Sequence, residues 1–286
     1  ITNIEFEDGP SDGRDPPDYG GGLYIVDSSP TIKNNVIYGC IASVGGGLYI
    51  QNSSTLVSNC TISNCDAWSH GGGIFIDDSD EGVPPRIIGC NISDNTAQYG
   101  GGLRLWGDTA IVINNTISGN DASGISVSSK NALICGNLII GNSASGIRIN
   151  SGKSTIIGNM IVENTAGHGG GISEYSGAHI VIENNTISNN TASVRGGGIH
   201  TKNDSITIVN NIVWDNSAPL GSQLYLLAFA DPTQAYVDYS NIMYGEDSVY
   251  IDTYASLNWG PGNIDADPLF ESGPICDYHL SMSSPC

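Results

Sequence analysis

The chain has 286 residues and a formal net charge of −20, because 29 acidic side chains face only 9 lysines and arginines. This excess of negative charge argues against nucleic acids and anionic membranes as partners. It also repels polyanionic sugars unless divalent cations bridge the two. No run in the chain approaches the roughly 18 apolar residues that span a bilayer, so we expect no membrane insertion.

A glycine-rich unit followed by a short apolar strand recurs along the chain. It reads GGGLYI at residues 20–25 and 45–50, GGGIFI at 71–76 and GGGLRL at 100–105. Reduced copies begin at Ser123, Ser145, Gly169, Gly196, Ser222 and Ser248. Successive units are 22 to 29 residues apart, a period that is typical of stacked repeat proteins.

A second module, with the pattern I-x-N-N-x-I-x-x-N-x-A, lies between the glycine units. Aligning its copies places amide or thiol side chains in two columns. Coils stacked about 4.8 Å apart would let each inward amide donate to one neighbour and accept from the other. The first column is Asn35, Cys60, Cys90, Asn115, Asn137, Asn159, Asn185, Asn211 and Asn241, and the second is Cys40, Cys65, Asn95, Asn120, Asn142, Asn164, Asn190, Asn216 and Glu246.

Short strands with alternating apolar residues, joined by glycine and asparagine bends, predict an all-β chain without a sustained helical segment. We expect a single parallel β-helix, a solenoid of about ten coils, over residues 1–253. The repeat breaks near residue 254, and residues 254–286 are predicted to form an irregular C-terminal tail packed on the helix.

The GGGI and NNTI modules resemble those of right-handed β-helix repeat proteins of the pectin-lyase-like superfamily, in particular a secreted or surface-bound group. The resemblance covers roughly residues 20–251 and implies right-handed coils. The strings DADPLF and DYHLSMSSPC look like the segment that often closes the coils in that group. The tripeptide GHG at residues 167–169 matches an element of polygalacturonases, but their other aspartate motifs do not appear, and the alignment explains His168 as a bend residue.

Six of the seven cysteines form three pairs that are placed for disulfide bonds. In two pairs the partners share a column on neighbouring coils, within the Cα range that a disulfide accepts. The alternative is that these thiols replace asparagine as small buried members of the column. Three disulfides would indicate an extracellular or cell-surface location. The predicted pairs are Cys40–Cys65, Cys60–Cys90 and Cys276–Cys286.

The first outward position after the glycine bend carries aromatic residues at both ends of the chain. Exposed aromatic faces along a flat sheet can stack on sugar rings or contact another protein. The alternative is that these rings stack on one another for stability alone. The predicted binding residues are Tyr24, Tyr49, Phe75, Tyr225 and Tyr250.

Three residues are the candidates for catalysis. Arg148 and His200 share the outward column, and Glu174 lies in a neighbouring column that is mostly apolar. A carboxylate at such a position is costly unless it is paired, so it marks either a site or a local bend that turns Glu174 into solvent. Hydrolysis normally needs two carboxylates and lyase chemistry needs a base with a charge neutraliser, so one carboxylate is a weak basis for an enzyme.

An acidic loop supplies the candidate ligands for a metal ion. Asp77, Asp78, Asp80 and Glu81 are oxygen ligands of the kind that calcium prefers, although they lack the spacing of an EF-hand. The alternative is a solvated acidic surface. We expect no cofactor other than such a calcium ion.

These observations favour a non-enzymatic module outside the cell or on its surface, with a structural or adhesive role. Unpaired strand edges at the helix ends indicate one of two arrangements: the chain is part of a longer protein, or coils of neighbouring subunits stack end to end, as in a filament. The expected partners are a polysaccharide, bound through the aromatic column, or another surface protein. The alternative is a polysaccharide lyase or glycoside hydrolase of the superfamily named above.

Overall fold

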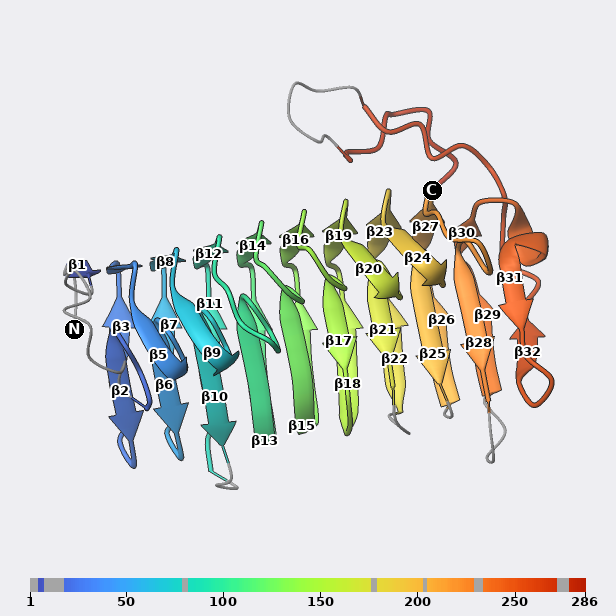
Figure 1. Cartoon of the computed structure of the whole chain (residues 1–286). Helices are drawn as coiled ribbons and strands as arrows, with labels where there is room; N and C mark the ends of the chain where they lie inside the picture. Colours follow the sequence, from blue (N-terminus) through green and yellow to red (C-terminus); the bar gives the residue numbers. More distant parts are fainter. Residues whose placement is uncertain are drawn as a thin grey trace.

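The computed structural model describes residues 5–7, 18–78, 82–175, 179–202, 205–228, 234–271 and 278–286. The described chain is an all-β, right-handed parallel β-helix whose coils stack side by side along one axis (Figure 1). The N-terminal coils lie at one end of the axis and the C-terminal coils at the other. Among the described residues, no helix is long and apolar enough to cross a membrane.

One face of the helix is a ten-stranded parallel sheet that takes one short strand from each coil. Its strands follow the asparagine bends, and each pairs in register with the strand of the next coil. Its strands are β1 (Glu5–Glu7), β4 (Val36–Tyr38), β8 (Thr61–Ser63), β12 (Asn91–Ser93), β14 (Thr116–Ser118), β16 (Leu138–Ile140), β19 (Met160–Val162), β23 (Thr186–Ser188), β27 (Ile212–Trp214) and β30 (Asn241–Ile242).

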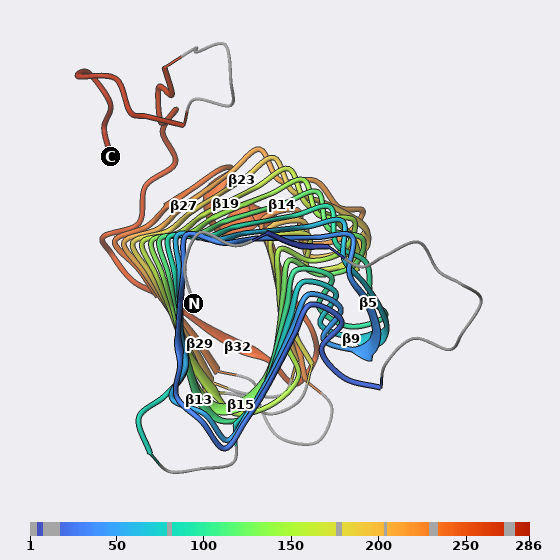
Figure 2. The ribbon, with the colours of Figure 1, turned by 90° about the vertical axis from the view of Figure 1, so that its left-hand side faces the viewer.

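The other faces belong to an 18-stranded sheet that bends around the helix (Figure 2). The strands that follow the glycine units are β2 (Leu23–Val26), β6 (Leu48–Gln51), β10 (Ile74–Asp78), β13 (Leu103–Ile113), β15 (Ile125–Cys135), β17 (Ile147–Ile149), β21 (Ile172–Glu174), β25 (Ile199–Lys202), β28 (Leu224–Leu227) and β31 (Val249–Ile251). The strands that precede the asparagine bends are β3 (Thr31–Lys33), β7 (Leu56–Ser58), β11 (Arg86–Ile88), β18 (Lys153–Ile157), β22 (Ile180–Glu183), β26 (Ser205–Val209), β29 (Gln234–Asp238) and β32 (Ser256–Trp259).

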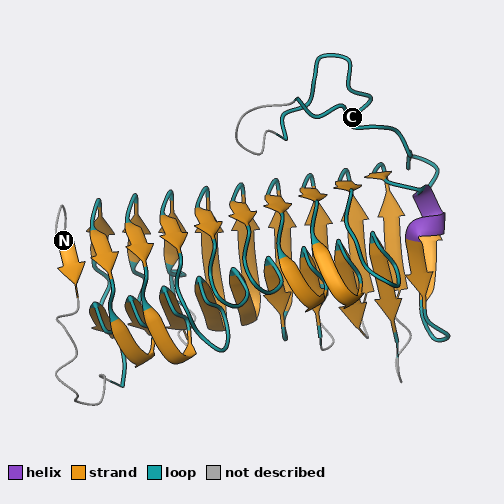
Figure 3. Cartoon of the chain, turned by 45° about the horizontal axis from the view of Figure 1, so that its top comes forward, coloured by secondary structure: helices purple, strands orange, loops and turns teal. Residues whose placement is uncertain are grey.

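Two pairs of short strands project from the helix as arms, between the ten-stranded sheet and the glycine units (Figure 3). They are β5 (Ile41–Val44) with β9 (Asp66–His70), and β20 (Thr165–His168) with β24 (Thr191–Arg195). Three coils lie between the two pairs, and two of these coils are shorter at this point. Three residues separate Asn120 from Gly124, and three separate Asn142 from Gly146, whereas six separate Asn164 from Gly171. The arms are therefore interrupted in the middle of the helix.

The glycine units mark a place where backbones of neighbouring coils approach closely. Gly45 has a φ of 66°, which an L side chain rarely adopts. A Cβ atom on Gly47 would lie 2.5 Å from the carbonyl oxygen of Gly73 on the next coil. The recurrent GGG motif is therefore a packing requirement, and isoleucine side chains fill the interior beside it.

The two asparagine columns are hydrogen-bonded ladders, as predicted. The Asn164 side chain donates to Asn190 Oδ1 at 3.0 Å, and its own Oδ1 accepts from the backbone N–H of Asn142 at 3.0 Å. The last coil differs from the prediction. Ser240, not Asn241, accepts from the Asn211 backbone N–H, and Gln223 closes the second ladder by accepting from Asn216. Glu246 is exposed in the 3₁₀ turn η1 (Gly245–Ser248) and does not belong to the ladder.

No disulfide bond joins Cys40 to Cys65 or Cys60 to Cys90, so the two predicted bonds are not formed in the structure. The thiols take the place of the amides: the Cys60 thiol donates to the Ser58 carbonyl at 3.3 Å, and the Cys60 backbone N–H donates to Cys90 Sγ at 3.5 Å. A hydrogen bond with Cys60, and then burial, raise the pKa of Cys90, which keeps it protonated. Cys276 lies outside the described residues, so the Cys276–Cys286 pair stays a prediction.

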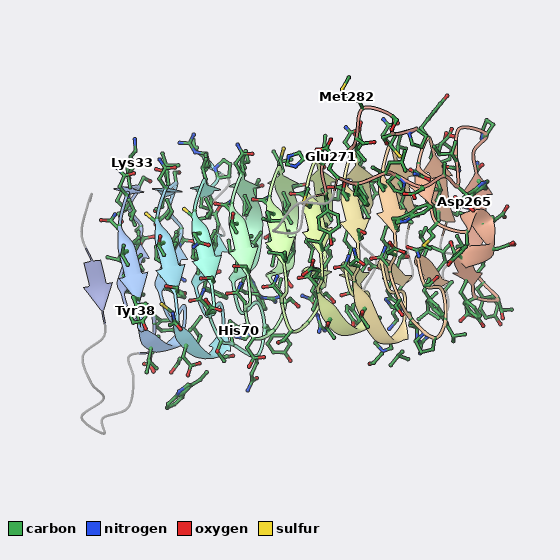
Figure 4. The ribbon with its side chains drawn as sticks, turned by 90° about the horizontal axis from the view of Figure 1, so that it is seen from above. Lys33, Tyr38, His70, Asp265, Glu271 and Met282 are labelled. Atoms are coloured by element: carbon green, nitrogen blue, oxygen red, sulfur yellow. The ribbon has the colours of Figure 1, made fainter. Side chains whose placement is uncertain are left out.

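The ladder of paired strands continues through β32, past the boundary predicted at residue 253. The described part of the tail then turns back along the ten-stranded sheet, and Asp265, Glu271 and Met282 lie over the C-terminal coils (Figure 4). The Tyr278 hydroxyl contacts both Asn189, at 3.0 Å, and Glu163, at 3.2 Å. These contacts hold the tail against the helix.

Candidate functional site

A groove runs along the helix between the arms and the strands that follow the glycine units. Its floor is the outward column of those strands. One wall is the arm column, in which Tyr19 pairs with Val44, Val44 with His70 and His70 with Tyr99. The other wall is the column two residues beyond the floor, in which Asp77 pairs with Trp106 and Trp106 with Ser128. His70 lies at the arm edge of the helix (Figure 4).

Two hollows in this groove share His70 and Trp106 and so form one continuous depression. The first has a volume of about 350 Å³ and the second about 410 Å³. The first is lined by Tyr19, Val44, Tyr49, His70, Phe75, Asp77 and Trp106, and the second by His70, Tyr99, Arg104, Trp106, Ser128, Asn150 and Ser151. A third hollow, of about 590 Å³, lies under the tail, but no carboxylate, imidazole or guanidinium lines it.

The outward column is one continuous ladder, as the alignment predicts. Tyr24 pairs with Tyr49, Tyr49 with Phe75, and Tyr225 with both His200 and Tyr250. Their rings stack between coils, with centroids 5.3 Å apart for Tyr49 and Phe75 and 4.8 Å apart for Tyr225 and Tyr250.

The exposure expected of this column is found only at its ends. Tyr24 and Tyr250 are exposed, but Tyr49, Phe75 and Tyr225 are 4%, 7% and 3% exposed, because neighbouring rings and the arms cover them. Their stacking stabilises the coils, which is the alternative considered for the pattern. Whether any of the five contacts a ligand stays a prediction.

The exposed rings of the groove lie on its walls. Tyr19, Tyr99 and Trp106 are each between 42% and 48% exposed. The sequence alignment assigns Tyr19 and Tyr99 to the bend column, but it gives no sign that this column forms the wall of a groove. Trp106 follows directly after a GGGLRL unit and pairs with two polar residues, Asp77 and Ser128. The sequence therefore indicates the position of Trp106 but not its role.

Two arginines occupy the floor where the arms are interrupted. Arg104 pairs with Ser126, which pairs with Arg148 on the following coil. Arg104 donates to Ser126 Oγ at 2.6 Å and to Ser128 Oγ at 2.9 Å, and its guanidinium lies 5.2 Å from the Trp106 ring centre. This part of the groove is polar and cationic in a chain that is strongly acidic overall.

The three candidate catalytic residues lie on adjacent strands, but two of them are buried. Tyr175 joins Arg148 to His200, since it lies 4.3 Å under the Arg148 guanidinium and 5.9 Å from the His200 ring. Glu174 is 1% exposed, and its Oε2 accepts the backbone N–H of Lys202 at 2.6 Å. Glu174 is therefore turned inward, not into solvent as the alternative had it.

Burial decides the protonation state of two histidines, His200 and His168. Burial, followed by the charges of His168 and Arg195, lowers the pKa of His200 to about 3. Burial and then Arg195 also lower the pKa of His168. Both imidazoles are therefore neutral near pH 7, and their ring centres lie 5.3 Å apart. A neutral His200 that is 2% exposed has little access to a substrate.

Of the four candidate calcium ligands, the structure describes Asp77 and Asp78. Asp77 accepts from Gln51 Nε2 at 2.9 Å and from the Tyr49 hydroxyl at 3.3 Å, and Asp78 is buried. Asp80 and Glu81 lie outside the described residues. Within the described part of the chain, no three His, Cys, Asp or Glu residues gather in a way that would hold a metal ion, so calcium binding stays a prediction.

Comparison with known proteins bears on the fold. A family model described as "Right handed beta helix region" matches residues 21–177. No curated protein matches the sequence. A solved structure titled "Crystal structure of Dettilon tailspike protein (gp208)" superposes with a TM-score of 0.59 and 19% sequence identity. The match covers 92% of this chain and 58% of the tailspike chain, so this chain spans a little over half of that protein's length.

Proposed function

Since the chain belongs to the right-handed β-helix family, we propose that it is an extracellular or cell-surface module that binds a carbohydrate in the groove beside the arms. The observation that carries the proposal is the continuous depression with exposed aromatic rings on both walls, Tyr99 on one and Trp106 on the other. Such rings offer flat apolar faces to sugar rings, while polar groups beside them hydrogen-bond to hydroxyls.

The polar groups in the groove suit this ligand. Ser128, Asn150 and Ser151 line the same hollow as Trp106 and supply hydroxyl and amide groups. The residues that line the two hollows come from successive coils along the helix axis, so an extended sugar chain laid along that axis can contact both hollows.

Binding is favoured over catalysis by the state of the candidate catalytic residues. A glycoside hydrolase needs two carboxylates that reach its substrate. Glu174 is buried and bonded to the Lys202 backbone, and Asp77 accepts from two side chains. The similarity of this fold to that of a tailspike protein supports a role outside the cell. The proposal also includes a structural or adhesive role through end-to-end assembly.

The experiment is a binding screen on immobilised neutral and acidic polysaccharides with two tryptophan variants. Trp106→Ala removes a ring that lines the groove, whereas Trp68→Ala removes a ring of similar exposure on β9 that lines neither hollow. We expect Trp106→Ala to weaken binding about tenfold, or about 1.4 kcal/mol, and Trp68→Ala to leave it unchanged.

Two outcomes would overturn this proposal. Equal losses in both variants would mean that the groove is not the binding site. Release of shortened sugars from any polysaccharide in the screen would favour the lyase or hydrolase alternative.

A further inference from the structure

Arg104 is a buried cation without a carboxylate partner. Its side chain is 5% exposed, and it is one of the residues that line the second hollow. A guanidinium has five N–H donors, and two of them donate to Ser126 and Ser128. The buried Nε makes no hydrogen bond with the described residues, and the structure gives Arg104 no ion pair among them.

A second cation lies close to the first. Arg148 stands two coils further on, about 10 Å away along the stack. Its Nε donates to Asn150 Oδ1 at 3.0 Å, and Asn150 Nδ2 donates to Ser126 Oγ at 3.2 Å, the same hydroxyl that accepts from Arg104. The two guanidinium groups thus share one network of neutral acceptors.

The Arg104 guanidinium remains charged at neutral pH. Burial, followed by the charge of Arg148, lowers the pKa of Arg104 to about 10, which still leaves it protonated. Removing a cation from water without a counter-charge is costly in free energy, and hydrogen bonds to hydroxyl groups offset little of that cost. An anion bound in the hollow would offset it, because charge-assisted hydrogen bonds from arginine are about twice as strong as neutral ones.

The acidity of the rest of the chain does not prevent an anion from binding in the hollow. Charges separated by more than about 8 Å of physiological salt solution are largely screened. The carboxylate on the wall of the neighbouring hollow, Asp77, already accepts hydrogen bonds from Gln51 and Tyr49. The net charge of −20 would repel a densely charged polymer, but it permits a sugar chain with isolated acidic groups.

We propose that the hollow lined by Arg104, Ser128 and Asn150 is a subsite for one acidic group of a carbohydrate, a carboxylate or a sulfate ester, whose ring lies against Trp106. The proposal rests on the carbohydrate-binding function proposed above and names the class of sugar. Arg148 strengthens the local positive field, and the interruption of the arms leaves room for the charged substituent.

The test compares charged and neutral sugars of the same shape by titration calorimetry at physiological salt concentration. The probes are methyl glucuronoside against methyl glucoside for the carboxylate, and galactose 6-sulfate against galactose for the sulfate. We expect at least one acidic probe to bind about tenfold more tightly than its neutral counterpart. The pair of probes that shows the preference identifies the acidic group as a carboxylate or a sulfate ester.

Three variants assign the effect to the hollow. Arg104→Gln keeps a hydrogen-bond donor near Ser126 but removes the charge, and it should abolish the preference for the acidic probe. Arg148→Gln should reduce the preference without abolishing it. Lys130→Gln changes the net charge equally, but Lys130 is 69% exposed, pairs with Asp108 and lies outside the hollow, so it should have no effect.

The outcomes separate this proposal from the general one. If neutral sugars bind through Trp106 and acidic sugars bind no better, the acidic subsite is wrong and the binding function stands. If no sugar binds, both fail. An equal loss of preference in Arg104→Gln and Lys130→Gln would show that the net charge of the chain, not the hollow, selects the acidic sugar.

Discussion

The asparagine ladder allows a quantitative prediction at Asn164, in the middle of the helix. Its side chain is fully buried, and its two N–H groups donate to three acceptors, the Ile139 carbonyl, the Val162 carbonyl and Asn190 Oδ1, each at 3.0 Å. We count these contacts as two net hydrogen bonds. Its Oδ1 accepts the backbone N–H of Asn142 at 3.0 Å. Asn164→Ala removes all of these contacts at once.

The expected cost follows from what the substitution leaves behind. The buried N–H of Asn142 loses its acceptor, which costs about 2 kcal/mol. Loss of two further net hydrogen bonds, at about 1 kcal/mol each, brings the total to about 4 kcal/mol. Asn164→Cys should cost about half as much, since the chain itself uses cysteine at this column position in Cys65 and a thiol can accept weakly.

Native-state hydrogen exchange is the suitable assay, because stacked repeats can unfold in parts and a single unfolding free energy is then poorly defined. The Asn142 amide should lose most of its protection in Asn164→Ala and less in Asn164→Cys. Thr165→Ala changes the exposed residue next to it and serves as the control. A cost below about 1 kcal/mol for Asn164→Ala, or equal costs for alanine and cysteine, would refute the ladder argument.

Three further predictions concern ionisation, thiols and metal. The pKa of His200 lies near 3 in the folded chain and near 6.5 in the unfolded chain, so the unfolded state binds the extra proton and stability falls as pH drops below about 6.5, by up to about 1.4 kcal/mol per unit. Urea midpoints should therefore fall more steeply between pH 6.5 and 4 in the wild type than in His200→Gln, and parallel slopes would contradict this. The four ladder thiols, which are 1–2% exposed, should react with a thiol reagent only after unfolding, and rapid labelling of the native chain would contradict the structure. If the acidic segment that begins with Asp77 and Asp78 at the end of β10 binds calcium, the melting temperature should rise with calcium but not with magnesium, and Asp77→Asn should remove that rise.

The sequence predicted the columns well because, in a solenoid, the repeat period determines which residues of neighbouring coils pair. Each coil returns to the same position after 22 to 29 residues, so aligning Tyr49 with Phe75 or Val44 with His70 is enough to place them side by side. The same logic failed in the last coil, where the alignment placed Asn241 opposite Asn211. The strands pair Ile212 with Asn241, so Ser240 is the residue that faces Asn211 in the ladder.

Exposure was harder to predict than position. Tyr49 and Tyr225 point outward, as expected, but coverage by neighbouring residues depends on how far each arm projects and on the next ring in the stack. The groove wall at Trp106 and the uncompensated charge of Arg104 could not be predicted from one column, because the hollow is formed by residues from three columns together. The thiol pairs were ambiguous for a chemical reason, since a cysteine suits both a disulfide and an amide position in the ladder.

The exchange of thiols for amides along the ladders gives the helix an energetic polarity. Cys40, Cys60, Cys65 and Cys90 all lie in the first coils, whereas the coils from Asn115 to Asn216 carry asparagine in both ladders. Thiols are weaker hydrogen-bonding groups than amides, so the coupling between neighbouring coils is smaller near the N-terminal end. In a linear array, each repeat is stabilised by its neighbours. We therefore expect folding to nucleate in the asparagine-bearing coils and to spread toward the N-terminus. The N-terminal coils should be the last to fold and the first to unfold.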